Sequence, residues 1–489
     1  MAIKHGTGQA SARGGEFVGT KEAAAELGVS EATMRRWLAE GRIAGRRVGK
    51  QWRIARSELG RAVRVPEVSE GELASVGSEL LARLDRELSA ALGEEDVPLP
   101  EELADWASPG AARLIRQAIR EGVSDLHIEP GAETVKIRKR IDGLLHDVVT
   151  LSRESGKALV DRIKETSAMD ATERSRPQFS VVRTQIGGET IDLHLATFPA
   201  WRGESLTIRL MHPSRIKLGL EHLGFEPDQL AAYRRIIHMP YGLVLGGGPA
   251  GCGKTTTVYS TLFELSGPGV KVMTAENPVE YDIEGMTQMQ IDPAIGVGYS
   301  QAIYSMMRSA PNIMFVGELL DLQTAEQLVQ AAMTGHMVFS LVHAGTTIGI
   351  IGRLIDLGLE RRMIGSAVRG LFTQRLLRLI CPECKVEYDP QDQELTALGL
   401  DPHDRSRTFW CGKGCAACNQ TGYRGRTAVF EVLEMTDELR EAIVAEASPS
   451  RLAEIAHAQG WRPLREVALA KLYGGETTLA EATCVAFDS

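Results

Sequence analysis

One stretch restricts the fold of this chain more than any other: Gly248-Pro-Ala-Gly-Cys-Gly-Lys-Thr255, which fits the pattern GxxxxGK[ST]. It follows the apolar run YGLVLGG and precedes TTTVYSTLFEL, a run compatible with a helix. A glycine-rich turn between a strand and a helix can aim backbone N–H groups and the helix dipole at one point, an arrangement that binds phosphate oxygens. The stretch therefore predicts a nucleotide site in an α/β domain.

The residues of this loop predict a division of roles in binding ATP. Lys254 can reach the β- and γ-phosphates, and the Thr255 hydroxyl can ligate Mg²⁺. We expect the nucleotide to contact Gly248, Pro249, Ala250, Gly251, Cys252, Gly253, Lys254, Thr255 and Thr256.

Hydrophobic patterning changes along the chain and indicates several domains, as its 489 residues allow. Apolar runs such as KVMTAE and NIMFVGEL suit buried parallel strands, whereas TVKIRKRIDGLL and ETIDLHLATF alternate and predict antiparallel strands. The run ELLARLDRELSAALG has leucines along one stripe and predicts a helix. We divide the chain into a flexible tail (1–16), a basic unit (17–64), an acidic helical linker (65–108), an α+β domain (109–215), a nucleotide-binding domain (216–380), a cysteine module (381–430) and a helical C-terminal region (431–489).

The composition excludes several classes of protein. With 43% hydrophobic and 24% charged residues the chain is globular rather than disordered. Its net charge of −9 means that any contact with nucleic acid must come from a local basic patch. We find no run of 18 apolar residues and no apolar signal core near the N-terminus. We therefore expect a cytoplasmic protein without a transmembrane segment.

Four of the seven cysteines form two CxxC pairs, Cys381/Cys384 and Cys415/Cys418. Two such pairs can supply four thiolates to a tetrahedral Zn²⁺, and a site closed in this way is structural rather than catalytic. Cys411 is an alternative ligand, although its spacing from Cys415 fits less well. Cys252 and Cys484 are interpreted as isolated thiols.

Further motifs follow one another in an order that resembles the ATPase family of type II secretion and type IV pilus assembly, from about residue 109 to 435. They are SDLHIEP (124–130), IRKRIDGLL (137–145), GESLTIRL (203–210), GPAGCGKTTT, TAENPVEY (274–281), IMFVGELLD (313–321), TGHMVFSLVHAG (334–345) and TGYRGRTAVFEVL (421–433). The resemblance implies a hexameric RecA-like motor that uses ATP to move an inner-membrane platform protein. It places the chain in the cytoplasm, peripheral to the inner membrane.

The same resemblance assigns roles to residues outside the loop. Glu318 would polarise the attacking water, which agrees with a carboxylate that follows the apolar strand IMFV. Glu276 and Glu280 would hold Mg²⁺-bound water or orient the site, and His343 would contact the γ-phosphate. Positive charge for the phosphates would come from Arg209 with Arg138 or Arg140.

For some of these residues, and for His336 of the motif TGHMVFSLVHAG, a purely structural or solvent-exposed role is the alternative. Glu280 could be a solvated loop acid. Arg138 and Arg140 could form a solvated strand face. His336 could be a hydrogen-bonded structural histidine.

Four positions depart from the family pattern. Asn277 stands where the acidic box has Asp, and Leu320 stands where the segment around Glu318 has Arg. His194 replaces the Arg of Asp-Leu-Arg, and Phe179 replaces the Asp of Pro-Gln-Asp-Gly. Because the phosphate loop and Glu318 are intact, we expect a slow motor or one that needs activation rather than an inactive protein.

The basic unit has a different character from the rest of the chain. GTKEAAAELGVSEATMRRWLAEGRI predicts two helices around a turn, and RRVGKQWRI predicts two short strands around Gly49-Lys50. The unit resembles the excisionase-type winged helix-turn-helix family. Residues 31–64 include ten Lys or Arg and three Glu, a local net charge of +7 that suits a phosphate backbone.

DNA is therefore a candidate partner of this unit. The residues that would contact it are Arg35, Arg36, Arg46, Arg47, Lys50 and Arg53. The alternative is a module that docks an acidic protein or lipid headgroups.

Together these patterns predict a multidomain α/β protein. A RecA-like P-loop ATPase core follows an α+β domain, with a winged helix-turn-helix at the N-terminus and a zinc module near the C-terminus. Two rival functions remain: a DNA-binding regulator whose ATPase body senses nucleotide, and a scaffold that binds nucleotide without hydrolysing it.

Overall fold

The computed structural model describes residues 17–21, 23, 38, 45–48, 51–55, 78–92, 109–186, 189–211, 219–403 and 406–487. In the N-terminal unit it defines a three-stranded antiparallel sheet of order β1-β3-β2, formed by β1 (Phe17–Val18), β2 (Gly45–Val48) and β3 (Gln51–Ala55). Val48 pairs with Gln51, so β2 and β3 are the two short strands predicted around Gly49-Lys50. Arg35, Arg36 and Lys50 lie outside the described residues.

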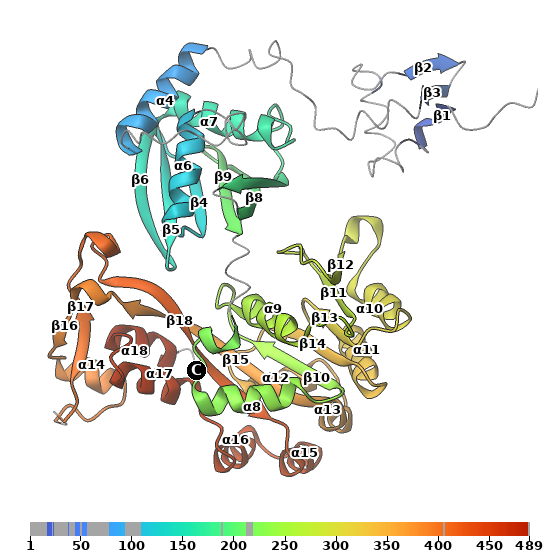
Figure 1. Cartoon of the computed structure of the whole chain (residues 1–489), viewed down its shortest axis with the longest axis vertical. Helices are drawn as coiled ribbons and strands as arrows, with labels where there is room; N and C mark the ends of the chain where they lie inside the picture. Colours follow the sequence, from blue (N-terminus) through green and yellow to red (C-terminus); the bar gives the residue numbers. More distant parts are fainter. Residues whose placement is uncertain are drawn as a thin grey trace, which may run out of the picture.

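The next domain is a six-stranded antiparallel sheet covered by helices on one face (Figure 1). The strand order is β6-β5-β4-β9-β8-β7, which confirms the antiparallel strands that alternation predicted. Its elements are α4 (Ser78–Leu92), α6 (Pro109–Arg120), β4 (Asp125–Pro130), β5 (Thr134–Ile141), β6 (Leu144–Ser152), α7 (Arg153–Thr166), β7 (Phe179–Ile186), β8 (Glu189–Ala200) and β9 (Gly203–Met211).

Helix α4 packs onto this domain, although we predicted that it belongs to a linker. Leu84 and Leu88 are fully buried in the same hydrophobic cluster as residues of α6, α7 and the sheet. The Asp85 carboxylate accepts from the Gly110 amide at 2.9 Å, and Glu87 accepts from the Ser152 amide at 3.0 Å. The leucine stripe explains the difference, because an amphipathic helix must bury its apolar face against something.

The two faces of the antiparallel sheet differ because side chains alternate along each strand. Leu126, Ile128 and Ile137 are buried beneath the helices. Their neighbours on β4 and β5 point to the other face, where His127 lies opposite Arg138 and Asp125 lies opposite Arg209 of β9. We call this second surface the charged face.

A seven-stranded sheet forms the nucleotide-binding domain, with strand order β12-β11-β13-β14-β10-β15-β18. The first six strands are parallel to their neighbours, as the buried apolar runs predicted, and β18 is antiparallel. The strands are β10 (Gly242–Gly247), β11 (Val272–Glu276), β12 (Met286–Gln290), β13 (Ile313–Val316), β14 (Met337–Val342), β15 (Val368–Ile380) and β18 (Tyr423–Glu434).

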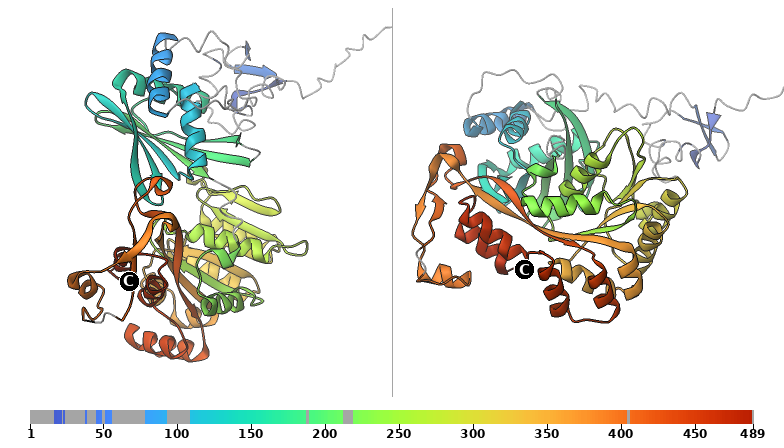
Figure 2. Two further views of the ribbon diagram at one scale, coloured as in Figure 1. Left: turned by 60° about the vertical axis from the view of Figure 1, so that its left-hand side comes forward. Right: turned by 60° about the horizontal axis from the view of Figure 1, so that its bottom comes forward.

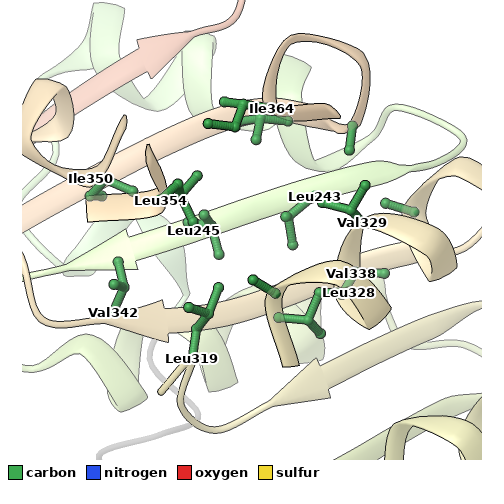
Figure 3. Packing of buried hydrophobic residues seen from close by; sticks show 14 of the residues in the cluster. Leu243, Leu245, Leu319, Leu328, Val329, Val338, Val342, Ile350, Leu354 and Ile364 are labelled. Atoms are coloured by element: carbon green, nitrogen blue, oxygen red, sulfur yellow. The ribbon is translucent and has the colours of Figure 1, made fainter. Parts of the chain in front are cut away.

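Hydrophobic cores lie on both faces of this sheet. Leu243 and Leu245 of β10 point into one core, which Figure 3 shows packed with Val338, Leu328 and Ile364, while Val244 points into the other. Helices α8 (Pro227–Ile237) and α9 (Lys254–Leu265) contribute to the core of Val244. The core of Leu243 and Leu245, on the other face, is covered by α10 (Tyr299–Met307), α11 (Leu322–Met333), α12 (Thr347–Asp356), α13 (Arg361–Ala367), α15 (Asp437–Val444) and α16 (Pro449–Ala458).

Strands β15 and β18 are long, and Figure 2 shows them extending side by side toward the cysteine module. This module contains the two-stranded sheet of β16 (Lys385–Tyr388) and β17 (Phe409–Gly412), with α14 (Asp392–Ala397) between them. Helices α17 (Leu464–Tyr473) and α18 (Leu479–Phe487) pack where the long strands leave the sheet.

A buried carboxylate joins the C-terminal helices to the sheet. Glu431 of β18 is fully buried, and its two oxygens accept from the amides of Thr347 and Leu464 and from the Thr373 hydroxyl at 2.8–3.1 Å. Thr347 and Leu464 are the first residues of α12 and α17, so the negative charge lies at two helix N-termini, where the helix dipoles favour it.

Within the described ranges, none of the helices has the length and apolar character that crossing a bilayer requires.

Candidate active site

The phosphate loop connects the end of β10 to the first turn of α9, as predicted. Gly248, Gly251 and Gly253 have φ angles of 139°, 74° and 91°, which residues with a Cβ rarely adopt. A Cβ at Gly248 would lie 2.6 Å from the Cys252 Sγ and 2.8 Å from the Gln374 carbonyl oxygen, whereas one at Gly251 would meet open space. The loop is thus packed on its inner side and open on the other, the form of a cradle for phosphate oxygens.

Lys254 and Thr255 lie at the N-terminus of α9, where the helix dipole favours anions. The Lys254 Nζ donates to the carbonyl oxygens of Gly248 and Pro249, both at 2.8 Å, so the ammonium group lies across the loop. The Thr255 hydroxyl donates to the Glu280 carboxylate at 3.4 Å.

The carboxyl ends of the parallel strands bring the remaining predicted residues to the same edge of the sheet. Glu276 ends β11, Glu318 follows β13, and His343 follows β14. The His343 Nε2 lies 2.5 Å from a carboxylate oxygen of Glu318, and the carboxylate is half-buried while the imidazole is exposed. The geometry suits a carboxylate that orients water, held in place by an imidazole.

His336 precedes β14, at the opposite edge of the sheet. Its Nδ1 lies 3.0 Å from the carbonyl oxygen of Ala331. The structure thus gives His336 a local backbone partner at the end of α11.

Glu276 is buried among donors from its own domain. Its oxygens accept from the hydroxyls of Tyr259 at 2.5 Å and Thr274 at 2.6 Å, and from the Gln288 amide at 3.3 Å. Burial raises the pKa of Glu276. These contacts fix the position of the side chain between β11, β12 and α9, so the geometry favours an orienting role over direct metal ligation.

Glu280 occupies a different environment, beside the Thr255 hydroxyl. Burial, followed by the charge of Glu276, raises the pKa of Glu280, while the charges of Arg209 and Lys254 act against this shift. A hydroxyl and a carboxylate oxygen are the ligand types that Mg²⁺ prefers, so these two residues fit the ion.

The three candidate arginines all lie on the charged face, but in different surroundings. Arg138 makes a bidentate pair with Glu129 at 2.6 and 2.7 Å. Arg140 donates to the Gly143 carbonyl oxygen at 2.7 Å. Arg209 donates its Nε to Asp125 at 2.9 Å, and its side chain is 63% exposed.

Arg209 is therefore the arginine best placed to meet a phosphate. Its charge reaches Glu280 of the nucleotide-binding domain. The same two domains meet at an ion pair between Arg183 of β7 and Asp282, at 3.3 Å.

Two departures from the family pattern contact each other. The rings of Phe179 and His194 pack edge to face, with centroids 5.9 Å apart. Burial lowers the pKa of His194, which favours the neutral imidazole. The other two departures, Asn277 and Leu320, are exposed.

The predicted cysteine pairs converge. One ligand atom from each of Cys381, Cys384, Cys415 and Cys418 lies within 4.8 Å of all the others, a separation that fits thiolates around one tetrahedral metal ion. Cys411 does not belong to this group, which is the arrangement expected from its spacing.

Sequence reasoning missed several polar residues that shape the site. Tyr259 donates to Glu276, and Tyr299 is the first residue of α10, where burial and the charge of Glu318 raise its pKa to about 12. Gln374 of β15 donates to the phosphate loop, and Arg375 lies next to that loop. Tyr259 lies five residues after Lys254, so the sequence could have placed it on the helix that follows the phosphate loop. Tyr299, Gln374 and Arg375 belong to no sequence motif.

In the N-terminal unit, only part of the predicted DNA-binding set can be placed. Arg53 is exposed on β3 and pairs in register with Arg46 of β2, and Arg47 follows on the same strand.

Comparison with known proteins identifies matches along most of the chain. The sequence profile described as "Type II/IV secretion system protein" matches residues 108–484, and a profile described as "Helix-turn-helix domain" matches residues 17–64. The second match has the same bounds as the predicted winged helix-turn-helix.

Two curated relatives illustrate the similarity. The type II secretion system ATPase E of Vibrio cholerae is 36% identical over 377 residues, which cover 77% of this chain and 74% of the relative. The type IV pilus assembly ATPase PilB of Thermus thermophilus is 35% identical over 407 residues, 83% of this chain but only 46% of that larger protein.

Solved structures share the fold. The ATPase DotB of Legionella pneumophila aligns with a TM-score of 0.58 at 18% identity, covering 81% of this chain and 98% of DotB. The pilus retraction motor PilT with bound ADP aligns with a TM-score of 0.54 at 22% identity, covering 76% of this chain and 95% of PilT.

Proposed function

The chain belongs to the Type II/IV secretion system protein family, as an ATPase of that family, and we propose that it forms a hexamer that hydrolyses ATP to power a type II secretion apparatus or a type IV pilus. One observation carries this proposal. The phosphate loop lies at the same sheet edge as the Glu318–His343 pair, so a triphosphate and a carboxylate that directs water can meet there.

Each residue of the site has a role in this proposal. Lys254 and the loop amides bind the β- and γ-phosphates, while Thr255 and Glu280 hold Mg²⁺, which neutralises phosphate charge when bound. Glu318 orients the attacking water, and His343 fixes the Glu318 carboxylate and approaches the γ-phosphate. Arg209 adds positive charge from the charged face; Arg138 and Arg140 support that face through their own contacts.

The central test is phosphate release by purified protein with Mg-ATP. Wild type is expected to release phosphate, and Lys254→Ala and Glu318→Gln are each expected to reduce the rate at least about a hundredfold. Glu318→Gln should still bind a fluorescent ADP analogue, because its carboxylate acts on water rather than on the bound phosphates. Tyr241→Phe, at the opposite edge of the sheet, serves as the control and should keep the wild-type rate.

The rival functions give other results. A wild-type protein that binds nucleotide without releasing phosphate would indicate a scaffold. A phosphate release rate that Glu318→Gln leaves intact would contradict the role proposed for Glu318.

The proposed hexamer needs a surface between subunits, and the charged face offers a candidate beside its arginines. Four large apolar side chains are exposed there or at the adjoining β8–β9 turn: Phe179, Val181, Phe198 and Trp201. Phe198 is 64% exposed and Trp201 is fully exposed. Large apolar side chains exposed on one surface commonly mark a protein interface.

Replacing this surface should weaken the ring. In light scattering after size exclusion with Mg-ADP, wild type is expected at the mass of six chains, and Phe198→Ser/Trp201→Ser at smaller masses. Tyr241 is an exposed aromatic residue at the amino end of β10, and the control variant Tyr241→Ser should leave the mass unchanged. A double variant that remains hexameric would exclude this surface as the interface, and a monomeric wild type would contradict the hexamer.

We propose that the four converging cysteines bind one structural Zn²⁺. Their four thiolates would complete the coordination, so the ion would stabilise the module in which β15 ends and β18 begins rather than take part in hydrolysis.

Zinc content can be measured directly in purified protein. Wild type and Cys411→Ser are expected to contain about one zinc per chain, and Cys418→Ser much less. Equal zinc in Cys418→Ser and Cys411→Ser, or none in wild type, would contradict the site.

The partner and the location are proposed from the family resemblance alone. We propose that the chain acts at the cytoplasmic face of the inner membrane on the platform protein of its apparatus. The similarity to both secretion and pilus ATPases supports either apparatus.

For the N-terminal module we propose duplex DNA as the partner, because the matching helix-turn-helix family and a local net charge of +7 both suit a phosphate backbone. In this proposal Arg35 and Arg36 reach the major groove, while Arg46, Arg47, Lys50 and Arg53 hold phosphates. An acidic protein partner is the alternative.

Fluorescence anisotropy with a labelled duplex tests this role. Wild type is expected to bind with an affinity that falls as salt rises, and Arg35→Ala/Arg36→Ala to lose at least about tenfold in affinity. Binding that is undetectable even at low salt would remove DNA as the partner. The ATPase rate of the double variant should match wild type.

A further inference from the structure

Strand β15 lies beside β10 and places two buried polar side chains, Gln374 and Arg375, beneath the phosphate loop. They are 1% and 7% exposed. Burying an amide and a guanidinium costs free energy unless their groups are hydrogen-bonded, so their contacts indicate what they do.

Gln374 connects the loop to the helix that follows it. Its Nε2 donates to the Cys252 carbonyl oxygen at 2.6 Å, and its Oε1 accepts from the Thr257 hydroxyl at 2.7 Å. One side-chain amide therefore fixes both the loop and the first turn of α9.

The bond to Cys252 also determines where a neighbouring N–H group points. The Cys252 carbonyl and the Gly253 N–H belong to one planar peptide unit and point in opposite directions. Because Gln374 holds the carbonyl toward β15, the Gly253 N–H is turned away from β15. Phosphate oxygens bind to backbone N–H groups of this loop, so Gln374 sets the direction of one of the donors.

Arg375 connects β15, next to the phosphate loop, to the segment that carries His343. Its Nη1 donates to the Gln374 carbonyl oxygen at 3.0 Å, and its Nη2 donates to the Gly345 carbonyl oxygen at 3.4 Å. The same Nη1 lies 3.6 Å from the position that a Cβ would take at Gly248. The planar guanidinium thus spans from beneath the loop to the residue two positions after His343.

We propose that Gln374 and Arg375 are positioning residues for ATP hydrolysis: Gln374 orients the phosphate-binding backbone, and Arg375 holds the His343 segment in register with it. The inference rests on the proposed hydrolysis and adds two residues to its machinery. Neither side chain needs to touch the nucleotide.

Gln374→Glu is the sharpest variant, because it keeps the shape but replaces the donor with an oxygen that faces the Cys252 carbonyl. The dissociation constant of a fluorescent ADP analogue is expected to rise about tenfold. Gln374→Met removes the polar group without adding charge, so it should raise this dissociation constant by a smaller factor. It replaces Gln374→Glu as the test variant if Gln374→Glu does not fold.

Arg375→Lys keeps the charge but loses the planar fork that reaches two carbonyl oxygens. Since Arg375 acts on the His343 segment, kcat for phosphate release is expected to fall about tenfold while KM changes less. A purely structural role would instead lower the thermal midpoint and leave both constants near wild type.

Arg378→Gln is the matched control, three residues further along β15. It loses a partly buried contact, the pair with Glu481 at 2.6 Å, at a distance from the loop. It should lower the thermal midpoint and keep ADP affinity within about twofold of wild type. If the Gln374 and Arg375 variants behave like this control, the inference is overturned; if wild type itself neither binds nor hydrolyses nucleotide, the proposed function fails instead.

Discussion

Negative charge gathered at one edge of a buried sheet is the constraint on which the site depends. Glu276, Glu280 and Glu318 lie near the strand ends where a triphosphate is proposed to bind. Burial raises the pKa of Glu276 and Glu280, which means that the surroundings disfavour their ionised forms. A site of this kind can accept phosphate only with compensating cations, and Lys254 supplies one from within the loop. Arg209 supplies another from a different domain, so the charge balance itself links the two domains.

In the part of the chain that the structure describes, helices cover one face of the antiparallel sheet, which is consistent with this requirement. Helices α4, α6 and α7 bury its apolar side, while the charged face remains available to the nucleotide-binding domain. The ion pairs on that face hold the arginines in defined positions: Asp125 accepts from Arg209, and Glu129 holds Arg138. Beside them, the exposed aromatic side chains provide apolar area that a polar cleft does not need but a subunit contact does.

The parts of the site that could be predicted are those fixed by local spacing. The phosphate loop, the acid after an apolar strand and the CxxC pairs each occupy a few consecutive residues, and the parallel topology then brings them together. Gln374 could not be predicted in this way, because its partners are set by the packing of β15 beside β10. The spacing of Tyr259 from Lys254 places it on α9, but its bond to Glu276 depends on how α9 packs on the sheet. The pairing of Arg138 with Glu129 likewise depends on strand register, and the place of α4 depends on which apolar surface its leucines meet.

The contact between Phe179 and His194 changes how the departures from the family pattern should be interpreted. Taken one at a time, each position loses a charged residue, which suggested a weakened site. The structure places the two side chains on adjacent strands and in ring contact. The family pattern has Asp and Arg at these positions, and at the largely buried position of His194 a charge without a partner would be costly. In this chain the two side chains form an edge-to-face contact, and burial lowers the pKa of His194, which favours the neutral imidazole that packs against Phe179. The two departures therefore pack against each other rather than leave a buried charge, and the cationic role that we propose at the nucleotide falls to Lys254 and Arg209, which this chain retains.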